Sequence, residues 1–269
     1  MSVSRVSRTD LIYLSFLLAL VSVYALHLFS FTLFEGFSTF SNDSFSYLLL
    51  ARKWSPYFAP GVVETLTWPA NTYPPGFAWL LAITGASEST WQGHLVVSIA
   101  ALLSIVLIGW LAYRELGWFY GGLLTVSFCL LPGVIVSSMG ILSENLYLAA
   151  SLAVLLLFSF IRENTECWPG WYVALFLFLW LALMTRTIGI SLIAALLVVS
   201  LLDRNLGKDR RIIFALIALM TIGLWQLWSL IDPQSKETTY LNFMTPLLGH
   251  ESQKALLATT ALGNVVFLD

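Results

Sequence analysis

The stretch that decides the fold is WYVALFLFLWLALMTRTIGISLIAALLVVSLL, residues 171–202, which carries a single charged side chain, Arg186. A membrane-spanning helix needs about 20 mostly apolar residues. The stretch is too long for one such crossing and short for two. Because Arg186 and Gly189 lie near its middle, we predict two short helices, 171–186 and 187–202, that turn near Arg186.

The rest of the chain is similarly apolar. Hydrophobic residues make up 58% of the 269 residues and charged residues 10%, and the mean hydropathy is +0.84. A soluble domain, which averages about 25% charged residues, would expose large apolar patches with this composition. We therefore predict an all-α, polytopic transmembrane helical bundle. The net charge of −2 leaves no basic footprint for nucleic acid.

Apolar runs elsewhere predict five more spans, at 11–34, 93–113, 118–138, 143–161 and 212–231. The run at 75–86 reaches only about 18 Å as a helix, which favours an interfacial or re-entrant segment. Seven spans result, so residues 1–231 are the predicted transmembrane domain, with a long first outer loop at 35–92. Residues 232–269 form an outer tail, in which 251–268 are expected to form an amphipathic helix on the outer surface.

The Lys and Arg residues predict the orientation. With a cytoplasmic N-terminus, eight of them lie on the cytoplasmic side: Arg5, Arg8, Arg114, Arg162, Arg204, Lys208, Arg210 and Arg211. Five lie on the outer side: Arg52, Lys53, Arg186, Lys236 and Lys254. This excess follows the positive-inside bias. We predict a multi-pass protein of the inner or plasma membrane, with its N-terminus in the cytoplasm and its C-terminus outside.

This topology brings three charged residues from distant parts of the chain, Asp43, Glu144 and Arg186, to the outer membrane face. Ionisable groups near the hydrocarbon are costly and usually mark function. Structural explanations stay open for each of them. Asp43 suits a helix cap and Glu144 the first turn of a helix, and Arg186 suits a side chain that snorkels to the interface.

The residues that follow Asp43 have helical spacing and predict a short amphipathic helix on the membrane. One stripe of this helix holds Phe45, Leu48, Leu49 and Arg52. The other stripe holds Asp43, Tyr47, Ala51 and Trp54.

Short motifs along the chain resemble one group of membrane enzymes. The motif Asp43-x3-Tyr47-x3-Ala51, followed by Tyr73-Pro74-Pro75-Gly76, is similar to the first-loop pattern of protein O-mannosyltransferases and the lipid A aminoarabinose transferase. Further similar motifs follow in the same order: Ala112–Gly117, Leu131-Pro132, Ser143-Glu144-Asn145-Leu146 and Met184–Gly189. Their order and spacing carry the resemblance, since each motif is short.

These families are glycosyltransferases of the GT-C fold that use polyprenyl-phosphate sugars. The resemblance implies inverting transfer of a hexosyl or pentosyl group, on the extracytoplasmic side, to a hydroxyl of a glycan, lipid or protein acceptor. It implies that Asp43 is the general base. Candidates for binding the donor phosphate or the substrate are Arg186, Glu144, Tyr47, Arg52 and Lys53. No cofactor follows with certainty, and a weak divalent-metal requirement through Asp43 and Glu144 stays open.

Two features depart from the family pattern. The family's first loop often carries two adjacent acids, whereas Asn42 precedes a single Asp43 here. Family members usually continue through more spans, so we expect this chain, which ends at Asp269, to be a fragment or a minimal member. Two other functions stay open, a transporter or flippase and an inactive truncated subunit. A carrier would usually show repeated halves and broken helices at mid-membrane, and the sequence shows no repeat.

Overall fold

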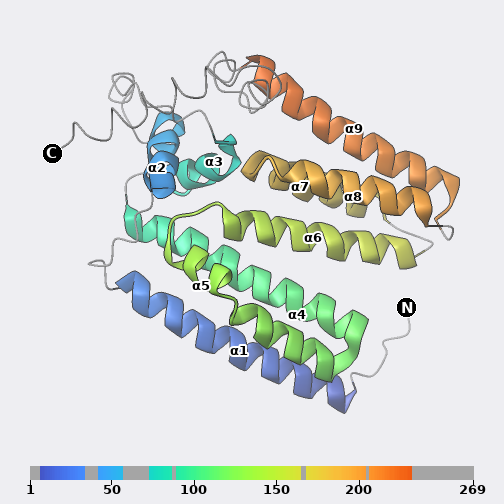
Figure 1. Ribbon diagram of the computed structural model, residues 1–269, viewed down its shortest axis with the longest axis horizontal. Helices are drawn as coiled ribbons and strands as arrows, with labels where there is room; N and C mark the ends of the chain where they lie inside the picture. Colours follow the sequence, from blue (N-terminus) through green and yellow to red (C-terminus); the bar gives the residue numbers. More distant parts are fainter. Residues whose placement is uncertain are drawn as a thin grey trace, which may run out of the picture. The chain divides into compact units, whose positions relative to one another are not determined.

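The structure is a computed structural model that describes residues 7–33, 42–56, 73–86, 89–164, 168–203 and 206–231. All regular secondary structure in these ranges is α-helical, which confirms the predicted all-α fold (Figure 1). The helices are α1 (Arg8–Leu33), α2 (Asn42–Trp54), α3 (Pro75–Ile83), α4 (Thr90–Cys129), α5 (Pro132–Met139), α6 (Glu144–Glu163), α7 (Pro169–Thr185), α8 (Gly189–Leu202) and α9 (Lys208–Ile231).

The chain divides into two compact units, Met1–Trp225 and Gln226–Asp269. The first unit holds α1 to α8 and most of α9, and everything described below belongs to it. Of the second unit the structure describes only residues 226–231, the end of α9. The predicted outer tail at 232–269, with its amphipathic helix at 251–268, lies outside the described residues.

α4 reverses its direction at Gly117, where φ is 77° and ψ is 179°. Glycine adopts this positive φ without steric cost. The two arms of α4 lie side by side, since the Gly121 backbone packs directly on the first arm. The Tyr13 hydroxyl of α1 reaches both arms, donating to the Gly109 carbonyl at 2.7 Å and lying 3.5 Å from the Thr125 hydroxyl. The predicted turn between the second and third apolar runs is therefore present.

The predicted span at 118–138 is not one continuous helix. α4 ends at Cys129, and α5 begins at Pro132 after an extended Leu131 with φ −64° and ψ 123°. Proline has no backbone N–H to donate and disfavours a helical conformation in the residue before it. The second arm of α4 and α5 are about 18 Å and 12 Å long, so each is shorter than a membrane crossing.

The chain breaks between α7 and α8 where the sequence predicts it. Arg186 is extended, with φ −147° and ψ 135°. Its N–H donates to the Ala182 carbonyl at 3.0 Å, and its carbonyl accepts from the Gly189 N–H at 2.9 Å. These two bonds hold a tight turn, so the Arg186 side chain starts from a fixed point at the end of both helices.

Helices α6 to α9 share one apolar core. Its fully buried members include Leu175 and Leu179 of α7, Ile193 of α8 and Phe214 of α9. Within a bilayer, close packing rather than the exclusion of water drives helices together. This core therefore joins the second half of α6 to α7, α8 and α9.

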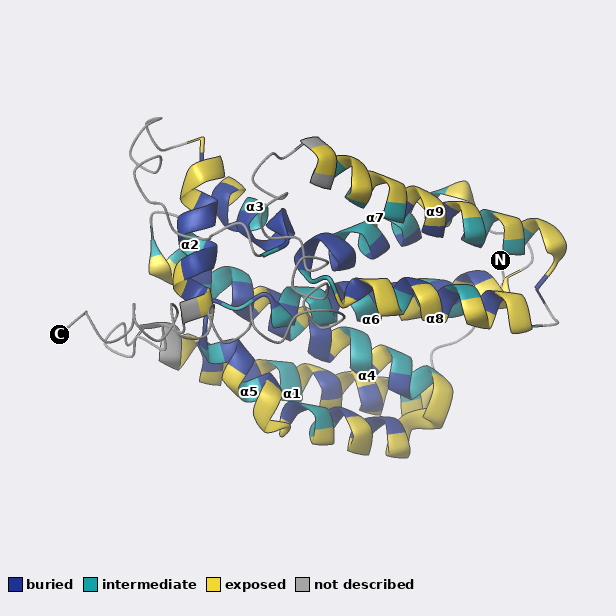
Figure 2. Cartoon of the chain, turned by 45° about the horizontal axis from the view of Figure 1, so that its top comes forward, coloured by how far each residue is buried: buried dark blue, intermediate teal, exposed yellow. Residues whose placement is uncertain are grey.

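Among the described residues, four helices are long and apolar enough to cross a membrane: α1, α4, α6 and α9. α7 and α8 are apolar but shorter. Leucines such as Leu18 and Leu26 on α1, and Leu216 and Leu219 on α9, are exposed, and Figure 2 shows exposed residues in yellow along these helices. The chain is an integral membrane protein. The count of seven spans and the orientation stay predictions.

α2 and α3 pack against each other beside one end of this helix bundle. α3 is mostly buried, including Phe77 and Leu81, whereas its last residue, Ile83, is exposed. α2 turns Tyr47 and Ala51 toward α3, whereas Phe45 is half exposed. Of the predicted stripe, Tyr47 and Ala51 pack into the protein, whereas Asp43 and Trp54 are exposed. Leu49 of the opposite stripe is also buried, so burial on α2 does not follow the two predicted stripes.

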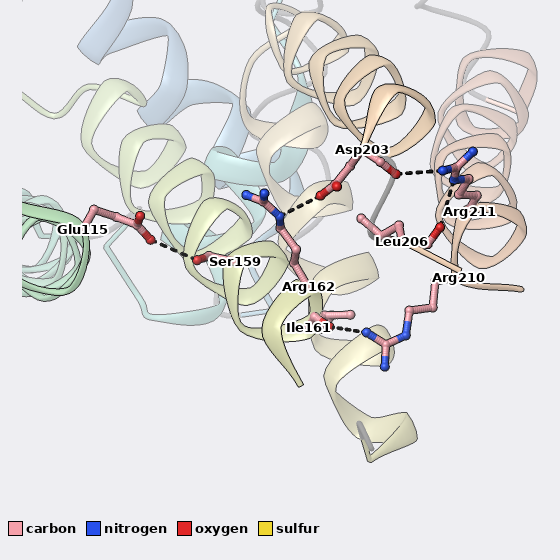
Figure 3. A network of polar contacts seen from close by, with 8 residues as sticks. All are labelled: Glu115, Ser159, Ile161, Arg162, Asp203, Leu206, Arg210 and Arg211. Atoms are coloured by element: carbon pink, nitrogen blue, oxygen red, sulfur yellow. Dashed lines mark hydrogen bonds and ion pairs between the residues drawn. The ribbon is translucent and has the colours of Figure 1, made fainter. Parts of the chain in front are cut away.

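A polar layer lies at the far end of α6, about 28 Å from its first residue. Arg162 pairs with Asp203 at 2.6 Å. Arg210 donates to the Ile161 carbonyl, and Arg211 to the Asp203 carbonyl, each at 2.8 Å (Figure 3). Carbonyls at helix C-termini lack partners within the helix, and these guanidinium groups supply them. The layer ties α6 and the turn after α8 to the start of α9.

Candidate functional site

Asp43 lies in the first turn of α2, exposed, at the end of the bundle where α2, α3, the start of α6 and the end of α7 meet. The Tyr73 hydroxyl, two residues before α3, donates a hydrogen bond of 2.5 Å to Asp43 Oδ1. This length is typical of a hydroxyl that donates to an ionised carboxylate. An acid in the first turn also suits the helix dipole. Asp43 therefore stabilises the start of α2 and also has a defined side-chain partner, Tyr73.

Tyr47 lies one turn further along α2 and links it to α6. Its hydroxyl donates to Ser143 Oγ at 2.8 Å. Its ring centroid is 4.8 Å from that of Tyr73 and 5.0 Å from that of Phe77, the latter edge-on. Aromatic pairs at these separations are favourable. Tyr47 thus joins the partner of Asp43 to the residue directly before Glu144.

The electrostatics of Tyr47 agree with this placement. Burial raises the pKa of the Tyr47 phenol above its usual value; the hydrogen bond with Ser143 lowers it, the charge of Glu144 raises it and that of Arg186 lowers it. The phenol therefore stays protonated and acts as a hydrogen-bond donor at neutral pH. The hydrogen bond to Ser143, the residue before Glu144, places Tyr47 close to the ion pair described next.

Glu144 and Arg186 form an ion pair between Glu144 Oε1 and Arg186 Nη1, which joins the first residue of α6 to the residue after α7. Their side chains are 40% and 39% exposed. The second carboxylate oxygen, Glu144 Oε2, is buried and has no hydrogen-bond partner among the described residues. Exposed ion pairs contribute only about 0–1 kcal/mol. An anion that offers Arg186 better geometry would therefore replace Glu144 at little cost.

A close helix contact positions this end of the bundle. A Cβ added to Gly76, in the first turn of α3, would lie 2.7 Å from the Met184 carbonyl oxygen. Only glycine permits this approach, so α3 rests directly on the last turn of α7. Tyr73 and Arg186 are each within three residues of this contact.

Arg52 and Lys53 lie apart from Asp43 along α2. Both are exposed in its last turn, about 14 Å along the helix axis from Asp43. The Lys53 ammonium lies 5.5 Å from the Trp54 ring centroid, and Trp54 meets Trp79 edge-on at 6.1 Å. These two basic residues therefore lie at the opposite end of α2 from Asp43.

The structure joins four of the predicted residues, Asp43, Tyr47, Glu144 and Arg186, through contacts that the sequence does not show. We call this set, together with Tyr73 and Ser143, the outer cluster. The sequence alone presents Tyr73 and Ser143 only as members of short motifs and predicts no role for either at the site. The sequence holds one weak signal for both, since each belongs to a short motif that carries the family resemblance.

The described residues include no group of three or more His, Cys, Asp or Glu side chains placed to hold a metal ion. Asp43 and Glu144 come from different helices; Asp43 accepts a hydrogen bond from a phenol, and Glu144 pairs with a guanidinium. A divalent metal at these two acids stays a prediction.

Fold and cluster together define an all-helical integral membrane protein with a polar, charged site at one end of its bundle. No protein-family model matches the sequence, and no curated protein matches it significantly. Two crystal structures of ArnT from Cupriavidus metallidurans are similar in fold. The complex with undecaprenyl phosphate has a TM-score of 0.58 and 21% identity, covering 84% of this chain and 43% of ArnT. The apo structure has a TM-score of 0.51 and 22% identity, covering 72% and 38%.

This likeness shows that the chain has the GT-C-like arrangement of helices that the sequence resemblance implies. The chain spans less than half the length of ArnT. The likeness in fold therefore does not by itself assign an activity, a substrate or a partner to this chain.

Proposed function

We propose that the chain is a membrane glycosyltransferase that moves a sugar from a polyprenyl phosphate to an acceptor hydroxyl on the extracytoplasmic side. The outer cluster is the observation that carries this proposal, because it joins a carboxylate and a guanidinium at one end of an apolar bundle. The fold supports it, since one of the similar ArnT structures holds undecaprenyl phosphate. ArnT is the lipid A aminoarabinose transferase, one of the enzymes that the sequence motifs resemble.

A polyprenyl-phosphate donor suits this arrangement physically. Its hydrocarbon chain would lie along the exposed apolar helices, and its charged phosphate would stay at the level of the outer cluster. A guanidinium group binds a phosphate through two parallel hydrogen bonds. The phosphate carries at least as much negative charge as the carboxylate that it would replace. Arg186 is therefore assigned to the donor phosphate, with Glu144 as its partner when no donor is bound.

The proposed reaction is a single displacement. The acceptor oxygen forms a bond to the anomeric carbon, while the bond between that carbon and the phosphate oxygen breaks and its electron pair stays on the polyprenyl phosphate. The acceptor proton passes to the Asp43 carboxylate, which acts as the general base. Arg186 stabilises the negative charge that develops on the leaving phosphate. The configuration at the anomeric carbon is inverted.

The other predicted residues take supporting roles in this scheme. Tyr47 and Ser143 hold α2 against the start of α6, and Glu144 orients Arg186. Arg52 and Lys53, at the far end of α2, are assigned to the anionic surface of the membrane or of the substrate. The sugar is a hexose or a pentose, and the acceptor is a hydroxyl of a glycan, a lipid or a protein.

Substitution of the two charged residues tests the assignment. The purified chain is incubated with radiolabelled undecaprenyl-phosphate pentoses and hexoses, and the release of undecaprenyl phosphate is measured with envelope glycolipids and glycans as acceptors. Asp43→Asn is expected to lower the rate by about 10²–10⁴-fold. Arg186→Ala is expected to lower it by about 10²–10³-fold.

The chain offers matched controls for both variants. Asp209→Asn removes an acid from the first turn of α9, and Arg114→Ala breaks an ion pair with Glu163 near the other polar layer. Both controls should keep the wild-type rate. Wild-type rates in Asp43→Asn and Arg186→Ala would overturn the assignment, and movement of intact lipid-linked sugar without transfer would favour the carrier function instead.

A further inference from the structure

Asp43 needs a fixed orientation if it is to serve as a general base. Its side chain is exposed in the first turn of a helix, where a carboxylate would ordinarily rotate in solvent. A base acts efficiently only when its lone pair faces the acceptor proton at hydrogen-bond distance. Some neighbour must therefore restrict the carboxylate.

Tyr73 is placed to provide that restriction. Its hydroxyl donates to Asp43 Oδ1 at 2.5 Å. A bond to one oxygen of a planar carboxylate sets the direction of the other oxygen, Oδ2. The acceptor proton would then be received by Oδ2, while Oδ1 stays bound to Tyr73.

The position of Tyr73 is itself fixed relative to Arg186. Tyr73 is followed by Pro74 and Pro75, whose restricted φ angles leave little freedom at the entry to α3. α3 packs closely on α7, since a Cβ added to Gly76 would lie 2.7 Å from the carbonyl oxygen of Met184, two residues before Arg186. Tyr73 thus ties its partner on α2 to the end of α7.

A second contact holds the ring of Tyr73. Its centroid lies 4.8 Å from that of Tyr47, and the Tyr47 hydroxyl is bonded to Ser143. Ser143 directly precedes Glu144, the ion-pair partner of Arg186. Two separate series of contacts therefore connect Tyr73 to the Arg186 guanidinium. One runs through α3 and the end of α7, and the other runs through Tyr47 of α2 and Ser143.

We infer that Tyr73 is a positioning residue that orients the Asp43 carboxylate and holds it at a set distance from Arg186. This role rests on the proposed function, because it requires Asp43 to be the base. It differs from a role in stability alone, since it acts on the rate of the chemical step and only while Asp43 is present.

Tyr73→Phe tests this role, because it keeps the ring against Tyr47 and removes only the hydroxyl. We expect kcat to fall by about 10–100-fold, with the KM for the undecaprenyl-phosphate sugar unchanged. Affinity for undecaprenyl phosphate, followed by the fluorescence of the tryptophans near α3, should also be unchanged. In an Asp43→Asn background, Tyr73→Phe should lower the rate no further.

Tyr113→Phe is the matched control. Tyr113 likewise donates its hydroxyl to an aspartate, Asp10, near the N-terminal end of α1, away from the outer cluster. Its removal should leave kcat and KM at wild-type values, so an effect of Tyr73→Phe alone would belong to the site.

The remaining outcomes distinguish failure of the proposed function from failure of the positioning role of Tyr73. A wild-type rate in Asp43→Asn would overturn the proposed function. A slow Asp43→Asn with a wild-type Tyr73→Phe would overturn only the role of Tyr73. An equal loss from Tyr73→Phe in both backgrounds, a weaker affinity for undecaprenyl phosphate, or failure of the variant to fold would show that Tyr73 serves the fold, and would also overturn its positioning role.

Discussion

Arg186 is paired with Glu144, whose carboxylate has the same negative charge as a phosphate, so Glu144 is a competitor of any phosphate that binds Arg186. The pair is about two-fifths exposed on both sides, so it is held weakly. Glu144 Oε2 lies buried without a hydrogen-bond partner in the described part of the chain. A negative charge there repels an arriving phosphate, while it keeps Arg186 pointed at the site in the absence of donor.

Glu144→Gln is therefore expected to strengthen the binding of undecaprenyl phosphate. The gain should be about two- to fivefold, which corresponds to the energy of an exposed ion pair of up to about 1 kcal/mol. Titration with undecaprenyl phosphate in detergent measures it. In an Arg186→Ala background the same substitution should have no effect. Weaker binding by Glu144→Gln would mean that Glu144 is instead a ligand of the donor.

At the scale of elements, the contact between α3 and α7 sets the geometry of the outer cluster. α3 reaches the α7 backbone only because residue 76 has no side chain. An added methyl group would have to displace one helix from the other, since the atom in its way is a backbone carbonyl oxygen rather than a flexible side chain.

Gly76→Ala is expected to destabilise the protein by about 1–3 kcal/mol, as overpacking usually does. Sugar transfer should fall as well, because α3 carries Tyr73 away from the end of α7. Gly223→Ala on α9 is the control, since no atom of the described residues lies within 4 Å of its added Cβ. Thermal unfolding in detergent compares the two variants. A Gly76→Ala protein as stable and active as the control would show that α3 and α7 can move apart without loss of stability or activity.

The elements that the sequence predicts well are those with a strong local cause. The turn between α7 and α8 follows from the length of one apolar stretch and from the charge of Arg186. The turn at Gly117 follows from the polar residues beside it. The break before Pro132 has an equally local cause in proline chemistry, yet the apolar run hides it, because hydropathy does not report backbone hydrogen bonds.

The outer cluster shows where sequence reasoning stops. A topology argument brings Asp43, Glu144 and Arg186 to one membrane face, but it places them only to within the width of the bundle. The hydrogen bond from Tyr73 to Asp43 joins residues 30 positions apart, and it depends on how α3 packs on α7. Such a contact is a property of tertiary packing, so no motif predicts it.

At the scale of the whole molecule, the predicted orientation has the outer cluster outside the cell and the Arg162–Asp203 layer in the cytoplasm. The excess of basic residues around the second layer supports this direction. The two layers lie at opposite ends of α6, so they must face opposite sides of the membrane if α6 crosses it.

Cysteine labelling tests this orientation directly. In a background with Cys129 and Cys167 replaced by alanine, Lys53→Cys should react with a membrane-impermeant maleimide in intact cells. Asp209→Cys, at the start of α9, should react only after the membrane is permeabilised. The opposite pattern would reverse the orientation and place the outer cluster in the cytoplasm, where a lipid-linked donor used outside could not reach it.

Ion pairs at the two ends of α6, Glu144 with Arg186 and Arg162 with Asp203, also bear on the choice of lipid. Glu144 and Arg162 are separated by about 27 Å along the helix, and any tilt shortens their spacing along the membrane normal. A typical hydrocarbon core measures about 30 Å. Because both charged layers need water or headgroups, the surrounding acyl chains must compress by a few ångströms, and this hydrophobic mismatch favours membranes of shorter or less ordered lipids.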